Sequence, residues 1–441
     1  MTKLYKPLFS DKAQGTLGGT LTYRDQKYGP SVGVRHRYVP QPSASQATQR
    51  NKFKSACADW QALTSTEKQA YHDDAPSGLN GFQYYISLNA VSSLADRYQY
   101  SKTITIDSTV IDSLLSWFPL AVPLSESAGL TAADLSDIFN EVGDDYLKIA
   151  IGIGNSEEQL FIEVEQWDAA NKRALLWVSR NTFEINPDSD TTLTFCYDAS
   201  ADDNTTFVGR AGVTQVWNND FAAVYTMAQD PNGGADCIID STGNGNHGTP
   251  NGNMVSADLV DGVIGKGLNF DGSDDYIDCG SDSSIDVDGK SLGYIAHIKP
   301  SAFSGANEFY LGKGDQGVRK VLHAGFRNST IWAALGFYGA DLDITHSFNT
   351  DVWYHLAGTY DQATQRGYIN GSQEGSTPNS ALSGSDNYPL LIGRGGASLT
   401  SSLNCIISFF ALFAGNFPSS DWIKADYHAQ TDNLLTWGAT G

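Results

Sequence analysis

Sulfur-containing residues are scarce in this sequence, which has 5 Cys and 3 Met among its 441 residues. The Cys residues are scattered along the chain, and no two of them form a C-x-x-C pair. This spacing disfavours a zinc site and a dense disulfide framework. We therefore expect mostly buried free thiols, with at most one disulfide bridge in the C-terminal part.

Long apolar runs are also missing, because no stretch approaches the roughly 18 apolar residues of a membrane-spanning helix. The opening residues, MTKLYKPLFSDKAQ, lack the apolar core of a signal peptide. We therefore expect no signal peptide, no membrane partner, and a protein made and folded in a cytoplasm. Display outside a cell would then need lysis or a particle.

Basic residues are few, with 28 Lys and Arg against 50 Asp and Glu and a net charge of −22. Residues 1–100 hold 12 basic and 7 acidic residues, whereas the rest of the chain holds 16 and 43. Because an acidic body repels DNA and anionic lipid, we expect no nucleic-acid partner. The basic head either meets an acidic surface or is a solvated arm. Its expected docking residues are Arg24, Arg35, Arg37, Arg50 and Trp60.

Helical periodicity is concentrated in the first hundred residues. Residues 1–47 alternate small, apolar and polar residues around Gly and Pro, which predicts a strand-and-turn arm. Residues 48–72 repeat apolar residues at helical spacing, and Thr64 or Ser65 caps a second short helix, with Glu67 placed for a capping box. The segment GFQYYISLNAVSS gives a third apolar stretch.

After about residue 100, strand-length apolar runs separated by turns replace the helical pattern. Examples are KTITIDSTV, LFIEVEQW and LGYIAHIKP, and the one expected helix lies in DLSDIFNEVG. The fold class is therefore mainly β. We expect a small α+β docking domain at residues 1–97, a β-sandwich spacer at 98–212 and a two-sheet jelly roll at 213–441.

Residues from about 216 onward carry the segments DSTGNGNHG, GKGLNFDGSDDYID, WYHLAGTYD, YING and LIGR. As a set they resemble the laminin G-like/concanavalin A-like lectin-glucanase superfamily, which implies a concanavalin A-like jelly roll and a polysaccharide ligand. The sequence departs from that family at His297, where Trp is usual, and in NCIISFFALF, which lacks the acidic residues of the last core strand.

Two further resemblances cover the rest of the chain. ITID, WFPLAVPL, EVEQWD and ALLWV in the middle unit resemble a small sandwich of unknown function that often precedes lectin-like domains. GTLGGTLTY, VRHRYVPQP, QRNKFKSACADWQALTSTEKQAY and SGLNGFQYYISLN resemble short proteins from structural gene regions of tailed phages and prophages. The last resemblance implies a virion protein that docks by its N-terminal unit.

Three acidic residues of EVEQWD are candidates for catalysis, namely Glu163, Glu165 and Asp168. Their spacing matches the acid-x-acid-x-x-acid pattern of jelly-roll glucanases, and residues two apart on a strand face the same side. The segment lies in the middle unit, however, whose resembling family has no known catalysis. We therefore expect solvent-facing strand carboxylates and no enzyme.

Two further sets of residues are candidates for binding. Oxygen-rich loops suit Ca²⁺, with Asp240, Asn244, Asp271 and Asp275 as expected ligands, although Asn-Gly and Asp-Gly equally favour tight turns without an ion. Sugars stack on aromatic faces and bond to charged groups. The expected ligand residues are Trp332, Tyr338, Tyr388 and Arg394, and packing in the core is the alternative for the aromatic ones.

The sequence therefore predicts a phage virion structural protein, either a capsid decoration, a head fibre or a tail-associated protein. Residues 1–97 would dock onto other virion proteins, and the jelly roll would display a site for host or environmental glycan. We expect a homo-oligomer, since such anchors are often symmetric. The alternatives are a structural decoration protein without ligand and a virion-borne glycan depolymerase that uses Glu163 and Glu165.

Overall fold

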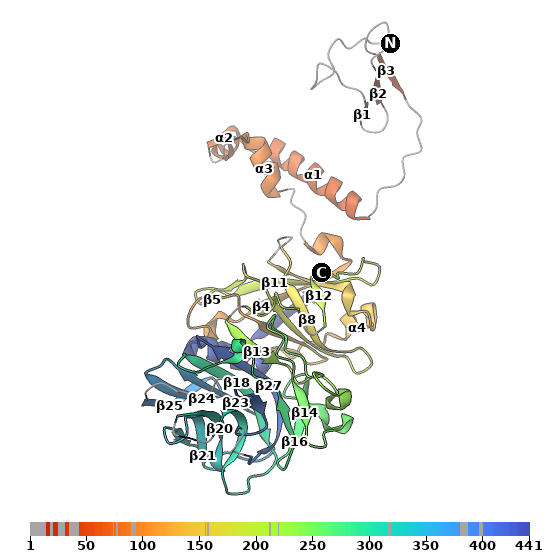
Figure 1. Cartoon of the computed structure of the whole chain (residues 1–441). Coiled ribbons are helices and arrows are strands. Elements are labelled where there is room, and N and C mark those ends of the chain that lie inside the picture. Colours follow the sequence, from red (N-terminus) through yellow and green to blue (C-terminus); the bar gives the residue numbers. More distant parts are fainter. Residues whose placement is uncertain are drawn as a thin grey trace. The chain divides into compact units, whose positions relative to one another are not determined.

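The computed structural model describes residues 15–17, 21–24, 31–34, 44–73, 75, 78–89, 94–154, 156, 158–210, 213–218, 220–315, 317, 319–379, 387–396 and 400–441. The chain forms two compact units, residues 1–92 and residues 93–441 (Figure 1). The expected boundary at residue 97 lies close to this division, whereas the one at residue 212 lies inside the second unit.

The first unit contains a small antiparallel sheet followed by three helices. The sheet consists of β1 (Gly15–Leu17), β2 (Leu21–Arg24) and β3 (Ser31–Val34). The helices are α1 (Ala44–Ala62), α2 (Ser65–Asp73) and α3 (Gly81–Asn89). The strand-and-turn arm and the helical segment predicted from the sequence are therefore confirmed for the described residues.

Reciprocal side-chain bonds fix the starts of α2 and α3. The Thr64 amide donates to Glu67 Oε2 at 2.8 Å, and the Glu67 amide donates to Thr64 Oγ1 at 3.3 Å, which confirms the predicted capping box. Asn80 and Gln83 form the same arrangement at the start of α3, with distances of 2.9 and 2.8 Å.

The second unit opens with a sandwich of two four-stranded sheets, ordered β28-β4-β11-β7 and β12-β8-β9-β6. The expected strands and the expected helix are present. Their bounds are β4 (Tyr100–Ile106), β6 (Leu120–Leu124), β7 (Ile149–Ile153), β8 (Phe161–Asp168), β9 (Arg173–Ser179), β11 (Thr191–Tyr197), β12 (Val208–Gly209) and α4 (Ser136–Val142), with a minor pair of β5 (Leu115–Ser116) and β10 (Glu184–Ile185).

The last strand of the chain belongs to this first sandwich. β28 (Leu435–Thr440) pairs antiparallel with β4, with Leu435 opposite Ile106 and Trp437 opposite Ile104. The segment expected as a self-contained jelly roll at 213–441 therefore gives its final strand to the middle unit.

The second sandwich has an eight-stranded sheet and a seven-stranded sheet. The first runs β15-β16-β27-β18-β23-β24-β25, with β13 also paired to β27, and the second runs β14-β17-β26-β19-β20-β21-β22. The eight-stranded sheet contains β13 (Phe221–Tyr225), β15 (Leu259–Asp261), β16 (Lys266–Asp271), β18 (Leu292–Pro300), β23 (Tyr354–Tyr360), β24 (Thr364–Ile369), β25 (Ser372–Pro378) and β27 (Asn404–Ala414). The seven-stranded sheet contains β14 (Thr249–Asn251), β17 (Tyr276–Asp278), β19 (Glu308–Gly314), β20 (Val321–Asn328), β21 (Ile331–Gly336), β22 (Leu342–Thr345) and β26 (Leu390–Ile392).

Both faces of β18 are buried, which explains its apolar sequence. Tyr294 and Ile298 pack in the core between the two sheets, whereas Ile295 packs in the cluster shared with the first sandwich. Successive side chains of a strand point to opposite faces, so one strand can serve two cores. Helix α5 (Ser420–Gln430) also packs in the shared cluster through Ile423, Ala425 and Ala429.

All five Cys are free thiols, and Cys196, Cys279 and Cys405 are buried. The expectation of mostly buried thiols is thus confirmed, and no disulfide bridge forms among these five residues. Within the described residues, no helix is both long enough and apolar enough to cross a bilayer.

Candidate functional site

The acidic residues of EVEQWD lie where the two sandwiches meet. Glu163 is fully buried. It accepts hydrogen bonds from Trp217 Nε1 at 3.0 Å and from Ser241 Oγ at 2.5 Å. Glu165 accepts from Trp177 Nε1 at 2.8 Å and from the backbone amide of Lys266 at 3.3 Å. The expectation that these are solvent-facing carboxylates is therefore wrong for Glu163, because the second sandwich covers it.

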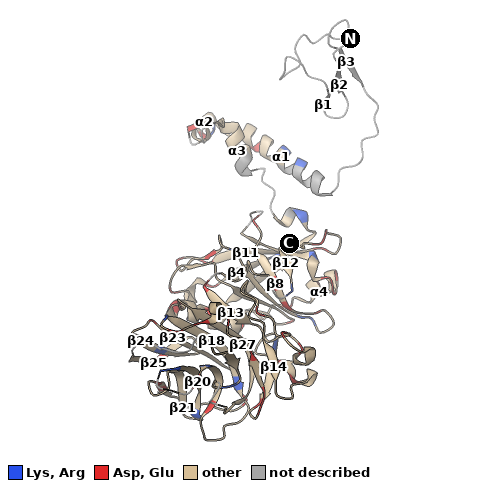
Figure 2. Ribbon diagram, viewed as in Figure 1, with Lys and Arg blue, Asp and Glu red and all other residues tan. Residues whose placement is uncertain are grey.

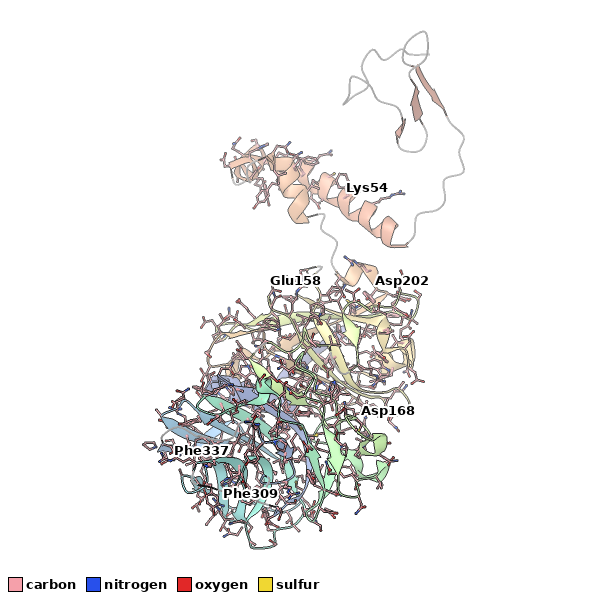
Figure 3. All side chains as sticks on the ribbon, viewed as in Figure 1. Lys54, Glu158, Asp168, Asp202, Phe309 and Phe337 are labelled. Carbon is pink, nitrogen blue, oxygen red and sulfur yellow. The ribbon has the colours of Figure 1, made fainter. Side chains whose placement is uncertain are left out.

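Asp168 has a local structural role at the end of β8. It accepts bonds from the amide and from Nδ2 of Asn171 at 3.0 and 2.7 Å, and these bonds hold its pKa below the ordinary value. Figure 3 labels Asp168 near the boundary of the two sandwiches. Retaining hydrolysis needs a sugar between two accessible carboxyl groups, an arrangement that the enclosed Glu163 does not offer.

The outer face of the eight-stranded sheet is covered by the first sandwich. Ile295, Phe409 and Phe413 of this sheet share one buried cluster with Trp177 and Val178 of β9. The rings of Trp177 and Phe409 stack with centroids 5.0 Å apart. The first sandwich therefore keeps a glycan away from this part of the sheet, whereas the edge strand β25 is exposed.

His297, where the sequence departs from the resembling family, lies in this covered region and is buried. Its ring meets that of His355 edge-on at 4.9 Å, and His355 Nε2 lies 2.9 Å from Asp426 Oδ2 on α5. Burial lowers the pKa of His297 well below its ordinary value, so its imidazole is neutral at pH 7. The His at position 297 is therefore part of the packing of α5 on the sheet.

Trp332 is a core residue, so its assignment to the ligand is wrong. Its side chain is fully buried between the sheets, and its Nε1 donates to the hydroxyl of Tyr310 at 3.0 Å. Stacking on a sugar needs an exposed ring face, which a fully buried indole does not have.

Tyr338 and Tyr388 lie in a group of charged and aromatic residues that we call the loop cluster: Lys313, Asp315, Arg319, Tyr338 and Tyr388. Lys313 Nζ donates to the Tyr388 carbonyl at 2.5 Å, and the Tyr388 hydroxyl donates to Asp315 Oδ2 at 3.3 Å. The Arg319 amide donates to the Tyr338 carbonyl at 3.1 Å. The loops that follow β19 and β21 and precede β26 therefore meet here.

The backbone at the loop cluster is conformationally unusual. Tyr338 has φ +33° and Arg319 has φ +62°, values in the left-handed region that bulky residues rarely adopt. Such conformations persist where the surroundings impose them, and they concentrate at functional sites. Tyr338 and Tyr388 are both partly exposed, so their rings can meet a ligand.

Arg394 stacks on the ring of Tyr276. Its guanidinium carbon is 4.9 Å from the centroid of the Tyr276 ring. Tyr276 directly follows the acidic loop of residues 271–275, and Gly393 closely approaches the carbonyl of Asp275. The four expected ligand residues are thus divided among the core, the loop cluster and this second surface.

Two of the four expected calcium ligands are used elsewhere. The carboxylate of Asp240 is buried and accepts from the amides of Val224, Thr242 and Asn246. Asn244 Nδ2 donates to the Ala222 carbonyl at 3.0 Å. The assignment of Asp240 as a ligand is therefore wrong, since its oxygens already tie β13 to the following turn, and Asn244 holds the same turn.

Asp271 and Asp275 do come together, with Asp274 as a third partner. Their oxygens lie within 4.8 Å of one another, with Asp271 and Asp274 exposed and Asp275 buried. Burial raises the pKa of Asp275, and the charge of Asp271 adds to the effect. Three crowded carboxylates on a turn suit a hard cation such as Ca²⁺, which would relieve their repulsion.

The docking candidates differ in what the structure describes. Trp60 packs inside the helical unit, with its ring centroid 5.3 Å from that of Tyr85 and 5.6 Å from that of Phe82. Arg50 is exposed on α1, as is Lys54, which projects from the same helix (Figure 3). Residues 35 and 37, and the side chain of Arg24 on β2, lie outside the described residues.

Sequence reasoning missed Lys313, Asp315 and Arg319. The segment GKGDQG reads locally as a turn between strands, but its first three residues, 312–314, end β19, and Asp315 directly follows the strand. Its role becomes visible only when residues 338 and 388 are brought beside it. The signal that could have found it is the unusual density of charge in a Gly-rich turn next to a buried strand.

Comparison with known proteins identifies the fold of the second sandwich. Residues 271–421 match the model of a family described as the concanavalin A-like lectin/glucanases superfamily. No curated protein matches the chain.

Solved structures show a partial likeness. Domain 4 of AbnA, an extracellular arabinanase from Geobacillus stearothermophilus solved with arabinotriose, is 18% identical, with a TM-score of 0.36, over 47% of this chain and 98% of that one. The binding domain of botulinum neurotoxin serotype D is 16% identical, with a TM-score of 0.36, over 48% of this chain and 51% of that one. The chain thus spans about half the length of the toxin structure.

Proposed function

We propose that this chain, whose second unit contains a concanavalin A-like domain, is a glycan-binding protein that holds polysaccharide at the loop cluster. The observation that carries the proposal is the pair of partly exposed tyrosines, Tyr338 and Tyr388, held beside Asp315 and Arg319. Aromatic faces supply stacking, and the charged groups supply bonds to hydroxyl groups. The burial of Glu163 where the two sandwiches meet favours binding over hydrolysis.

The test is the affinity for polysaccharide of the full chain carrying Tyr338→Ala and Tyr388→Ala. A glycan array selects the ligand, and calorimetry then measures the affinity. We expect the double variant to bind at least about tenfold more weakly, which corresponds to about 1.4 kcal/mol from two lost aromatic contacts.

The matched control is Tyr146→Ala, since Tyr146 is also partly exposed and stacks under Arg210 at 4.6 Å, but in the first sandwich. The control should bind as the wild type does. Equal binding by all three proteins would contradict the loop cluster as the site. An array without any ligand would favour the alternative of a structural protein that has lost glycan binding.

We also propose that Asp271, Asp274 and Asp275 hold Ca²⁺ near Arg394 and Tyr276. Titration with CaCl₂ should show binding by the wild type and its loss in Asp274→Asn/Asp275→Asn. Asp421→Asn, a change at a partly exposed position on α5, is the control. If glycan binding persists in EDTA, calcium has no part in it.

The attachment role of the first unit is a proposal that rests on the sequence. The resemblance of residues 1–97 to phage structural proteins and their basic charge support docking onto a virion. The full chain should co-sediment with particles of the matching phage, and a chain lacking residues 1–92 should not. Particle images would then distinguish capsid from tail. Co-sedimentation without the first unit would contradict this role.

Multivalent display would explain how a shallow site becomes useful. A single lectin-like site of weak affinity gains avidity by factors on the order of hundreds when many copies are tethered together. This holds only if the chain assembles in several copies. The number of copies is measured by light scattering on the full chain.

A further inference from the structure

We propose that the joint between the two sandwiches is a proton-dependent contact, in which a neutral Glu165 carboxyl group holds the sandwiches together and its ionisation loosens them. This inference concerns the junction of the second unit and does not depend on glycan binding. It rests on the way in which two acidic side chains of β8 bridge the sandwiches.

Two of the three carboxyl groups of β8 connect the first sandwich to the second. Glu163 accepts from Ser241, and Glu165 accepts from the Lys266 amide on β16. The hairpin before β16 comes very close, because a Cβ atom placed on Gly265 would lie only 2.2 Å from Glu165 Oε1. The carboxyl of Glu165 therefore has no room for a shell of water on that side.

The groups that bond to Glu165 are neutral. They are the indole of Trp177 and a backbone amide, and among the described residues no ammonium or guanidinium group bonds to its carboxyl. Glu165 is partly buried, and a carboxylate that is largely removed from water without a cation is costly, so such a group keeps its proton. The indole and amide N–H groups can also donate to a neutral carboxyl group, because its oxygens still accept hydrogen bonds.

The charged groups around Glu165 do not offset its ionisation. On β8 itself, the negative charge of Glu163 disfavours ionisation of Glu165. From the hairpin, the Lys266 ammonium is 2.8 Å from Asp261. From β9, Arg173 lies 3.6 Å from the same carboxylate. Both cations therefore pair with Asp261. The hydrogen bonds to Glu165 come from neutral donors, the Trp177 indole and the Lys266 amide.

The pKa of Glu165 is raised from 4.5 to about 8, chiefly by burial; the charge of Glu163 contributes to the rise, and the bonds from Trp177 and the Lys266 amide oppose it. Between these two values the closed joint binds a proton that an open or unfolded chain has released. Its stabilising effect is therefore fully present below about pH 4.5, declines between pH 4.5 and 8, and is constant above pH 8. Each pKa unit is a factor of ten, so the equilibrium for closing falls on the order of a thousandfold.

The first experiment compares the melting temperature of the wild type and Glu165→Gln, full chain, from pH 5 to pH 8. Gln keeps the shape of the neutral acid and cannot ionise. We expect the melting temperature of the variant, relative to that of the wild type, to rise by more than about 3 °C between pH 5 and pH 8. Glu184→Gln, an exposed change on β10, is the matched control and should follow the wild type.

The second experiment reads the joint directly in the wild type and does not depend on the variant folding. The indole N–H of Trp177 bonds to Glu165, so its proton–nitrogen resonance should titrate with a midpoint near pH 8. Trp177→Phe assigns the resonance. Parallel melting curves for the wild type and Glu165→Gln would overturn the proposal, and so would an indole resonance that is constant from pH 6 to pH 10.

Discussion

At the scale of single residues, burial separates the aromatic side chains that build the core from those that can reach a ligand. Trp332 and Tyr338 lie six positions apart and look alike in a list of aromatic residues near turns. The structure places the first between the sheets and the second at a partly exposed turn. The sequence could suggest candidates for sugar contact, but only the pairing of strands decides which ring faces the core.

Replacing Trp332 should therefore affect stability. Trp332→Ala removes a fully buried indole and leaves the Tyr310 hydroxyl without its donor. We expect a loss of about 3–5 kcal/mol in the free energy of unfolding, measured with urea. Tyr338→Ala is the comparison and should cost much less, because its ring is partly exposed. Equal losses for the two variants would contradict the core position of Trp332.

The acidic candidates show the same limit of local reasoning. Asp271 and Asp275, two of the four expected calcium ligands, lie close together because they belong to one short turn. Asp240 satisfies its oxygens with the backbone amides of Thr242 and Asn246 in the same turn and of Val224 on β13, and the bonding within the turn is of the kind that Asp often makes. An Asp that caps a turn and an Asp that binds a metal share the same sequence pattern.

At the scale of elements, local patterns identified most helices and strands. The Thr64–Glu67 capping box is visible in the sequence because both partners lie within one turn. α5 was missed, since its apolar residues face a neighbour that is far away in the chain. β28 was missed for the same reason: it pairs with β4 across more than 300 residues, and nothing near residue 435 indicates that partner.

The capping box gives a prediction for the first unit. Thr64→Ala removes the hydroxyl that accepts the Glu67 amide, and we expect a local loss of about 1 kcal/mol at the start of α2. Hydrogen exchange on the full chain should show faster exchange for the amides of that turn. Ser65→Ala, an exposed change one residue on, is the control. Unchanged exchange in Thr64→Ala would mean that the cap contributes nothing.

At the scale of the whole molecule, the two sandwiches of the second unit depend on each other. The sheet residues Ile295, Phe409 and Phe413 lie in one buried cluster with residues of the first sandwich. Residues 213–441 alone would also carry β28 without β4. The division of the chain suggested by its composition therefore does not correspond to pieces that fold separately.

This dependence predicts the behaviour of truncated chains. Residues 213–441, expressed alone, should aggregate or bind a hydrophobic dye, whereas residues 93–441 should remain monodisperse. Size-exclusion chromatography and dye fluorescence measure the difference. A well-behaved, dye-free fragment 213–441 would show that the shared cluster is dispensable.

The antiparallel pairing of β4 with β28 has one more consequence. The first and last strands of the second unit are neighbours in one sheet, and the concanavalin A-like sandwich is inserted between β12 and β28 of the first sandwich. A recombination event that exchanged this insert would leave both flanking strands in register. The exchanged domain would need two termini at a similar distance from each other and an apolar surface that packs against β9.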